Sequence, residues 1–451
     1  MIWPIGGMVR CSTYFQYAAT ALYLRSVMFG TTDDNALSCF LSPSMTVTKK
    51  HEPADVRINN RMMVFGQIFS SCPMSRAQIG RKTGLSRVAA CEVVSDMLDK
   101  HFLMENGYEQ PTRPGKKGTL VSVDDQYWNV VVLDLSMPFL LQAAVMNLRG
   151  EIVTRVEKSF DKITAITPET VIALAESLLD GASHILGFGV AVPGIVDEDG
   201  VVVETANFGW KNVPLRKMFQ QHFGKFCTVD NDANSALIGE RFCGAGRATG
   251  IFVQIAVGVG AALLIDDSLV LGSHHAAGEI GHVVVDPDGP QCTCGKRGCL
   301  ETFISAANLR RRINENPLDR TTMLQEAGRS LGHVLAPSVS LLDLDDVFVY
   351  GSKDIVDDIF LGATECAINA EAASTLQNHS IRVQQCSCGD DIVLRGESIA
   401  VVQAVLRNAN EYKKVPPVGL EPTTQDLKGR AHCVLTTLVN IYPYMVPPTA
   451  D

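Results

Sequence analysis

The sequence predicts an α/β body of two lobes, preceded by a smaller module of helices and strands. From about residue 128 to residue 410, apolar strands alternate with amphipathic helices, which is typical of an α/β architecture. Residues 57–120 differ, because they carry short helical patterns and hold ten Lys and Arg against five Asp and Glu. A chain of 451 residues is long enough for several domains of this kind.

The composition is that of a globular protein, with 46% hydrophobic and 20% charged residues. The formal net charge of −10 argues against nonspecific nucleic-acid binding by the whole surface, but it allows a local basic module. Thirteen Cys are scattered without a disulfide framework, so we expect reduced thiols and a cytoplasmic protein. No apolar run of about 20 residues is present, so we expect no membrane-spanning helix.

The two ends of the chain differ in character from the rest. We expect residues 1–55 to form a poorly ordered extension, with Met45 as a plausible true start. Residues 411–451 are rich in Pro and lack helical or strand periodicity, especially from Lys413 onward. We expect them to form a disordered tail that consists of read-through sequence.

Residues 56–124 predict a winged helix-turn-helix. An apolar helical stripe over residues 62–69 precedes a short helix at 75–82, for which Ser75 is the expected N-cap. A turn containing Gly84 leads to a second helix at 87–100, capped by Ser86, and two strands near 102–104 and 119–123 would form the wing. The apolar positions of the second helix are expected to be Val88, Cys91, Val94, Met97 and Leu98.

The positive charge of this module predicts DNA binding. The alternative is a three-helix packing module with a solvated basic face. The expected DNA contacts are Arg76, Arg81, Lys82, Ser86 and Arg87 from the helices and Arg113, Lys116 and Lys117 from the wing.

Residues 278–301 predict a structural Zn²⁺ site. One imidazole and three thiols, those of His282, Cys292, Cys294 and Cys299, lie within eighteen residues and are separated by turn-forming Gly and Pro. Zn²⁺ prefers four N and S ligands in a tetrahedron, and Cys₃His sets are common. The alternative is two unrelated Cys-rich turns or a disulfide. Two carboxylates, Glu279 and Glu301, bracket the set and would be held in place by the metal.

Several segments place polar side chains where a sugar could bind. A Pro-Gly turn ends with Gly194 after a strand, Asn207 precedes an aromatic, and Asn231 and Asp232 stand at a strand-to-helix junction. Sugar hydroxyls need carboxylate and amide partners that are held rigidly. Taken singly, Asp232 could instead be a helix N-cap, and Glu301 a first-turn carboxylate favoured by the helix dipole.

These motifs, GEIGH…CxCGxxGCLE at 278–301 above all, resemble the signature of the ROK family, which contains sugar kinases and sugar-responsive transcriptional repressors. The resemblance covers about residues 57–410. It implies an actin-like, ribonuclease-H-like body, with a small lobe at 125–230 closed by a helix near 397–410, and a large lobe at 231–396 with the zinc loop at 282–299. It also implies sugar contacts from Gly194, Asn207, Asn231, Asp232, Glu279, His282 and Glu301, with Asp232 as the base if the protein were a kinase.

Both phosphate loops depart from the kinase pattern of this family. The first, usually Asp-x-Gly-Gly-Thr, aligns with residues 134–138, where Met137 and Pro138 add bulk and remove an amide donor. The second, usually Gly-Thr-Gly-x-Gly-x-Gly, aligns with residues 256–262, where Val257 replaces the phosphate-binding Thr. We therefore interpret residues 258–260 as a tight turn between two strands.

The expected protein is a cytoplasmic, sugar-responsive regulator rather than an enzyme, and we expect it to be a repressor. It would bind operator DNA as a homodimer or homotetramer, take a sugar or sugar phosphate between its lobes, and carry structural Zn²⁺. One alternative is an ATP-dependent hexose kinase with a DNA-binding extension. Another is a DNA-binding protein whose body only dimerises and responds to a protein partner.

Overall fold

The computed structural model describes residues 53–69, 71, 73–109, 117–205, 207–372 and 380–416. The predictions made for residues 1–52 and 417–451 lie outside these ranges, as do those for Arg113 and Lys116. Within the described ranges, every helix is too short or too polar to cross a membrane.

The N-terminal module combines three helices with a small antiparallel sheet. The helices are α2 (Pro53–Phe69), α3 (Arg76–Thr83) and α4 (Arg87–Asp99). The sheet has the order β1 (Met74–Ser75), β3 (Thr119–Val123), β2 (Leu103–Tyr108). It therefore has one more strand than the two predicted, because the residues before α3 pair with β3.

Local chemistry fixes the ends of α3 and α4 as predicted. Ser75 forms a capping box with Gln78, in which the Ser75 main-chain N–H donates to Oε1 of Gln78 at 2.8 Å. Ser86 accepts from the main-chain N–H of Ala89 at 3.2 Å, and Gly84 ends α3 with a left-handed φ of 72°. Val88, which shares the helical spacing of the apolar positions, is nevertheless 67% exposed, because α4 packs through Ala90, Val93, Val94 and Met97.

The first lobe is built on a five-stranded sheet. In spatial order its strands are β11 (Phe226–Asn231), β7 (Ile185–Val192), β4 (Asn129–Asp134), β5 (Leu140–Asn147) and β6 (Ile152–Ser159). β4, β5 and β6 are antiparallel neighbours, whereas β7 and β11 continue the sheet in parallel. Helices α5 (Pro168–Ser177) and α6 (Leu215–Phe223) share a hydrophobic core with one face of this sheet. A small ribbon of β8 (Ile195–Val196), β9 (Val202–Glu204) and β10 (Lys211–Val213) lies between β7 and α6 in sequence.

The second lobe repeats this strand order. Its strands are β14 (Ser268–Leu269), β13 (Val259–Ile265), β12 (Gly250–Ile255), β15 (Asp346–Gly351) and β16 (Arg382–Gln385). Here too an antiparallel hairpin is followed by two parallel strands. One face packs against α8 (Leu300–Ile304), α9 (Ala306–Glu315), α10 (Arg320–Leu342) and α11 (Asp358–Ala372). Ser305 separates α8 from α9.

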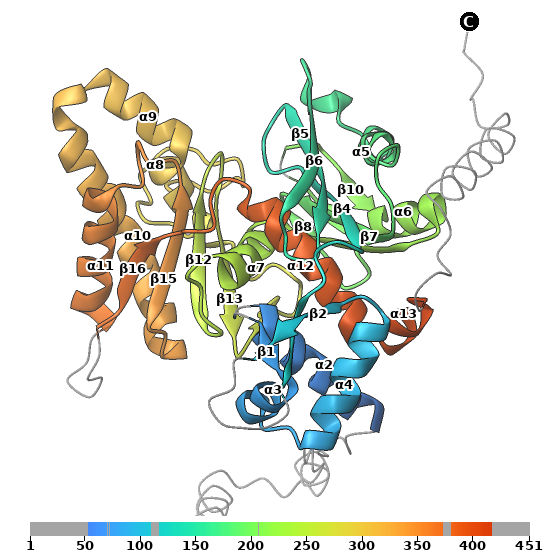
Figure 1. The fold of residues 1–451 in the computed structure, drawn as a ribbon. Coiled ribbons are helices and arrows are strands. Elements are labelled where there is room, and N and C mark those ends of the chain that lie inside the picture. Colours follow the sequence, from blue (N-terminus) through green and yellow to red (C-terminus); the bar gives the residue numbers. More distant parts are fainter. Residues whose placement is uncertain are drawn as a thin grey trace, which may run out of the picture. The chain divides into compact units, whose positions relative to one another are not determined.

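Two helices lie between the sheets, as Figure 1 shows: α7 (Asp232–Cys243) and α12 (Ile392–Arg407). α12 packs on the face of the first sheet opposite α5, and α7 packs on the second sheet. A short helix, α13 (Ala409–Lys414), follows α12. Ordered structure thus continues past residue 411, where the tail was expected to begin, and Tyr412 and Val415 are buried.

One hydrophobic core joins the N-terminal module to the body. It contains residues of α2 and α4, strands β4 and β5, and helices α12 and α13. Trp128 at its centre is 1% exposed, and its indole N–H donates to the main-chain oxygen of Lys100 at 2.7 Å. The module therefore shares apolar packing with the first lobe and with α12.

Candidate functional site

A polar pocket of about 290 Å³ is lined by residues of both lobes. The first lobe contributes the ends of β4, β7 and β11, and the second lobe contributes the hairpin of β12 and β13 and the loop before α8. All seven residues predicted to contact a sugar line this pocket, namely Gly194, Asn207, Asn231, Asp232, Glu279, His282 and Glu301. The structure thus brings together segments more than 100 residues apart in the sequence.

Asn231 builds one wall of the pocket by capping α7. Its Oδ1 accepts from the main-chain N–H groups of Ala233 at 2.9 Å and Asn234 at 3.2 Å. Its Nδ2 donates to the main-chain oxygen of Gly194 at 2.9 Å, which fixes the Pro-Gly turn against the start of α7. The helix cap is therefore Asn231, and the alternative that made Asp232 the cap is wrong.

Asp232 is the first residue of α7, and its carboxyl is 8% exposed. Burial, reinforced by the Asp134 carboxyl, raises the pKa of Asp232 to about 7. Nε2 of Gln254 on β12 donates to Oδ2 of Asp232 at 3.1 Å and opposes this rise. Asp232 therefore titrates near neutral pH, where it can either accept or donate a hydrogen bond.

Glu301 stands in the first turn of α8 and closes the hairpin between β12 and β13. Its Oε2 accepts from the main-chain N–H of Val259 at 3.0 Å. A Cβ at Gly258 would lie only 2.9 Å from the same oxygen, so this turn leaves no room for a side chain. The tight turn predicted at residues 258–260 lies two residues earlier: Ala256, Val257 and Gly258 connect two antiparallel strands, and Val259 and Gly260 already belong to β13.

Glu279 and His282 form the opposite wall. Oε2 of Glu279 lies 3.9 Å from Nε2 of His282. The Glu279 side chain is 46% exposed overall, yet loss of hydration at its carboxyl raises its pKa, and Glu301 adds to this while His282 opposes it. The pocket is therefore lined by three residues with carboxyl groups, Asp232, Glu279 and Glu301, and by two His, His275 and His282.

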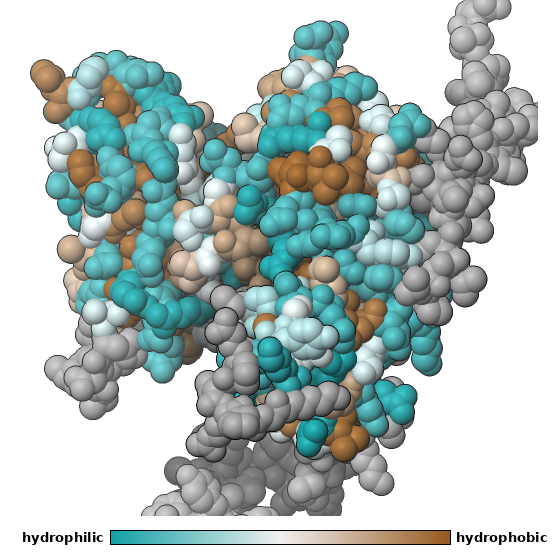
Figure 2. Space-filling view, in the orientation of Figure 1, coloured by the Kyte–Doolittle hydropathy of each residue, from teal (hydrophilic) through white to brown (hydrophobic). Residues whose placement is uncertain are grey.

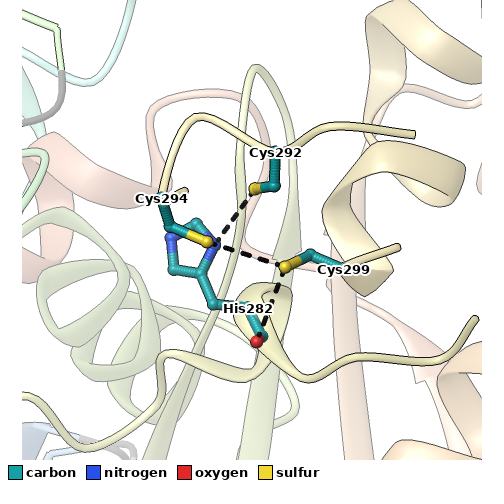
Figure 3. A group of neighbouring side chains, drawn as sticks. All are labelled: His282, Cys292, Cys294 and Cys299. Carbon is teal, nitrogen blue, oxygen red and sulfur yellow. Dashed lines mark hydrogen bonds between the residues drawn. The ribbon is translucent and has the colours of Figure 1, made fainter. Parts of the chain in front are cut away.

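His282 also belongs to a group of side chains that could hold a metal. The ligand atoms of His282, Cys292, Cys294 and Cys299 lie within 4.8 Å of one another, and they point toward a common centre (Figure 3). Nδ1 of His282 is 3.6 Å from Sγ of Cys292, and Sγ of Cys294 is 3.6 Å from Sγ of Cys299. Nδ1 faces the thiols and Nε2 faces Glu279, so the ring of His282 belongs both to the candidate metal site and to the pocket wall.

The predicted DNA contacts on the N-terminal module differ in their surroundings. Arg81, Lys82, Ser86, Arg87 and Lys117 are exposed, whereas Arg76 is half-buried and lies 3.6 Å from Glu105. The hydroxyl of Ser86 caps α4. On the other side of Arg87, the side chain of Val88 is exposed to solvent.

Sequence reasoning missed five polar residues that line the pocket: Ser136, Asn234, Gln254, His275 and Thr293. Gln254 carried a usable signal, because it is the one polar residue of the apolar strand β12. Buried polar side chains of this kind usually have a structural or binding role.

Two lobes with repeated strand order and a polar pocket between them define an actin-like, ribonuclease-H-like body. A solved structure described as a ROK family transcriptional regulator, a homologue of the Escherichia coli MLC protein, has this fold, with a TM-score of 0.66 at 19% identity over 80% of this chain and 99% of that one. The sequence itself matches the ROK family over residues 140–404, so the chain belongs to the ROK family.

Relatives with described functions fall into two groups. A xylose repressor from Caldicellulosiruptor bescii is 28% identical over 255 residues, which cover 54% of this chain and 63% of that protein. The DNA-binding transcriptional dual regulator NagC of Escherichia coli (strain K12) is 22% identical over 354 residues, covering 71% and 87%. A glucokinase from Thermotoga maritima is 36% identical over 166 residues, covering 36% and 51%. The chain thus spans less than two thirds of the xylose repressor, and the match to the NagC regulator is the more extensive.

Proposed function

We propose that this protein is a sugar-responsive transcriptional repressor of the cytoplasm. Residues 56–124 would act as a winged helix-turn-helix that binds operator DNA, and the pocket between the lobes would bind a sugar. The observation that carries the proposal is the joining of a polar, carboxylate-lined pocket to a basic module of this kind in one chain. Two of its relatives, one named a xylose repressor and one named a DNA-binding transcriptional dual regulator, agree with this assignment.

The N-terminal module supports DNA binding through its geometry. Helices α3 and α4 are joined by a short turn at Gly84, and a strand pair follows, which is the pattern in which the second helix enters a major groove. Arg87 and Val88 lie in the exposed first turn of that helix. A guanidinium suits a guanine edge or a phosphate, and an exposed Val suits a thymine methyl group. Two half-sites about one helical turn apart would require a homodimer or a homotetramer.

The segments that bind ATP in ROK kinases support a regulator over an enzyme. Met137 and Phe139 are 46% and 47% exposed in the turn between β4 and β5, and Phe139 has a left-handed φ of 63°. Val257 is 45% exposed at the tip of the other turn, where the family pattern has a Thr. A phosphate-binding loop needs free amides without bulky side chains beside them. Both segments lack that property.

The metal in the Cys₃His group is proposed to be structural Zn²⁺. Ligand atoms on a zinc tetrahedron with ordinary bond lengths are separated by roughly 3.6 to 3.8 Å, and the two separations above, each 3.6 Å, fit this. His282 and the three Cys would hold the ion. The bound ion would fix the position of the loop that carries Glu279 and of the His282 ring edge that faces the pocket. The pocket wall would then be rigid before the sugar arrives.

Coupling between sugar and DNA would run through α12 and α13. α12 packs against the first sheet and α7, and α13 continues into the N-terminal module, where Lys100 donates to the main-chain oxygen of Val415 at 2.6 Å. A change in the angle between the lobes would therefore move the DNA-binding helices and alter the spacing of two half-sites.

Fluorescence anisotropy with a DNA fragment from the protein's own promoter region tests this function. The full chain should bind the fragment with an affinity that falls steeply with salt and changes when one sugar is added. The function is rejected if the fragment binds no better than random DNA, with and without each sugar. Sequence-specific binding that ignores every sugar would instead favour a body that responds to a protein partner.

A ROK sugar kinase is the second candidate, and one observation favours it. A carboxyl with a pKa of about 7, as at Asp232, is well matched to general-base work at neutral pH. Under this alternative, ATP would be turned over with a sugar, and Asp232→Asn would abolish the turnover. We expect no such turnover above the level of that variant.

A further inference from the structure

A second pocket, of about 470 Å³, lies between helices α2 and α4 of the N-terminal module and helix α13. Each helix lines it with one side, since the lining positions of each are spaced by three and four residues. They are Arg57, Asn60 and Arg61 of α2, Ala89, Glu92, Val93 and Asp96 of α4, Lys100, and Ala409, Tyr412 and Lys413 of α13. On the face shown in Figure 2, the described part of the module presents hydrophilic side chains with apolar ones between them.

Positive charge predominates in the walls of this pocket. The cations are Arg57, Arg61, Lys100 and Lys413, and the carboxylates are Glu92 and Asp96. In the part of the chain that the structure describes, no ion pair within 4.0 Å joins any of the four cations to a carboxylate. Oδ2 of Asp96 instead accepts from the hydroxyl of Tyr412 at 2.8 Å. The pocket therefore holds unpaired positive charge, which attracts an anion.

Arg61 and Lys100 are the two cations of this pocket that are not exposed. Arg61 is 8% exposed, and its Nε has no hydrogen-bond partner among the described residues. Burial lowers the pKa of Lys100, which Asp96 opposes and Arg61 reinforces. Lys100 donates to the main-chain oxygen of Val415 at 2.6 Å, so its ammonium keeps two further N–H donors. A buried cation without a counter-charge is costly, and an anionic ligand removes that cost.

The pocket faces away from the side of α4 that is proposed to bind DNA. An α-helix turns by about 100° per residue, so Ala89, Val93 and Asp96 lie on one side of α4 and Arg87 lies nearly opposite. Operator DNA held by Arg87 would therefore leave the pocket free for a small molecule. The volume is larger than a free phosphate needs, and it lies in the range of pockets that hold small organic molecules.

We propose that this pocket binds a phosphate group, either as the free ion or as the ester of a small metabolite, through Arg61 and Lys100. The guanidinium fork suits two phosphate oxygens at once, and the ammonium supplies a compact charge. The exposed Arg57 and Lys413 would complete the cationic walls. The ligand would bridge α2, α4 and α13 and thereby tie the DNA-binding helix to the body. The inference stands whether or not the pocket between the lobes binds a sugar.

Isothermal titration of the full chain at constant ionic strength tests the site. The probes are inorganic phosphate, glycerol 3-phosphate and glucose 6-phosphate, with glycerol as an uncharged counterpart. We expect at least one phosphate compound to bind, and the double variant Arg57→Gln, Lys413→Gln to bind it about tenfold or more weakly. Arg329→Gln, which changes an exposed arginine on α10 outside the pocket, should leave the affinity unchanged. An ester that binds more tightly than inorganic phosphate identifies a metabolite as the source, whereas equal affinity identifies the free ion.

Two further measurements separate binding from folding. Arg57 and Lys413 are exposed, so the double variant should unfold at the same urea concentration as the wild type when no ligand is present. The ligand should raise the unfolding midpoint of the wild type and leave that of the double variant nearly unchanged. Arg61→Lys keeps the charge and loses the fork, so it should also weaken binding. Undiminished affinity in Arg61→Lys and in the double variant would overturn the assignment.

Three other results would also overturn it. Equal weakening in the double variant and in Arg329→Gln would show that phosphate responds only to the general charge of the surface. Tighter binding to Asp232→Asn would place the phosphate among the carboxyl groups of the pocket between the lobes. Displacement of the bound ester by random-sequence DNA would show that the pocket is part of a DNA-binding surface. Each of these outcomes leaves the sugar response of the proposed repressor untouched, because that response is measured with neutral sugars.

Discussion

Replacing Tyr412 by Phe should loosen the N-terminal module from the body. Tyr412 lies on α13 and is 2% exposed, and its hydroxyl donates to Oδ2 of Asp96 on α4 at 2.8 Å. Burial, together with the Asp96 carboxyl, holds the pKa of Tyr412 well above its ordinary value, so the phenol keeps its proton and donates. The ring stacks on Phe102 at 5.6 Å, and the guanidinium of Arg61 lies 3.8 Å from its centre.

The magnitude follows from what the substitution removes. A hydrogen bond to a charged group contributes about 1.5 to 3 kcal/mol when both partners are buried. Asp96 is exposed and regains water when the hydroxyl is lost, so we expect the free energy of unfolding to fall by about 1 to 1.5 kcal/mol. Tyr412→Ala also removes a buried ring and should cost about 3 to 5 kcal/mol.

Urea denaturation and DNA binding together measure this effect. Tyr108→Phe is the matched control, because Tyr108 is 68% exposed on β2 and its hydroxyl should contribute nothing. Tyr412→Phe should lower the unfolding midpoint, and it should also shrink the sugar-induced change in DNA affinity, since coupling of this kind is typically 1 to 3 kcal/mol. Identical midpoints and identical sugar responses for the two variants would refute the idea that α13 connects body and module.

Three further predictions address the metal, the pH dependence and the DNA. Cys294→Ser should lower the bound zinc measured by atomic emission, while Cys366→Ser on α11 should not; full zinc content in Cys294→Ser would contradict the ligand assignment. Burial raises the pKa of Glu397 to about 8, and the Asp230 carboxyl adds to this rise. In the folded protein Glu397 therefore keeps a proton that the unfolded chain loses above about pH 4.5. The free energy of unfolding should consequently fall as the pH rises from about 5 to 8. Glu397→Gln should flatten that fall in denaturation series, and an unchanged slope would show that another group causes it. Arg87→Ala should weaken operator binding and reduce its salt dependence by about one phosphate contact, whereas Arg311→Ala on α9 should do neither; equal effects would place the DNA elsewhere.

Short-range patterns in the sequence predicted local structure well. The caps at Ser75 and Ser86 follow from side chains that reach N–H groups three residues away, and the candidate metal site follows from four possible ligands within eighteen residues. Neither depends on how distant elements pack. The pocket was predictable for a related reason, because each of its segments lies at a strand end or next to the metal-binding loop, where an α/β body gathers polar groups.

Features that depend on packing between elements far apart in the sequence were not predicted. The contacts of α4 with α2 and with the body determine which side of α4 is buried. Val88 lies on the other side and is exposed, although its helical spacing would also fit a buried position. Tyr412 lies among residues whose composition is that of a tail, and its burial comes from partners more than 300 residues away. Asn231 and Asp232 are adjacent polar residues at one helix start, so only the structure shows which of them caps the helix.

The pKa of Asp232 does not by itself separate a kinase from a regulator, because a carboxyl that titrates near pH 7 suits both a general base and a sugar ligand. The hairpin between β12 and β13 separates them better. A phosphate would need the main-chain N–H groups of that turn, yet the N–H of Val259 already donates to Glu301 at 3.0 Å. Glu301 also lines the pocket, so the carboxylate proposed to bind sugar occupies a donor that a nucleotide phosphate would require. The turn therefore serves as a wall of the pocket proposed to bind sugar, and binding of ATP there would require Glu301 to move away and leave that wall open.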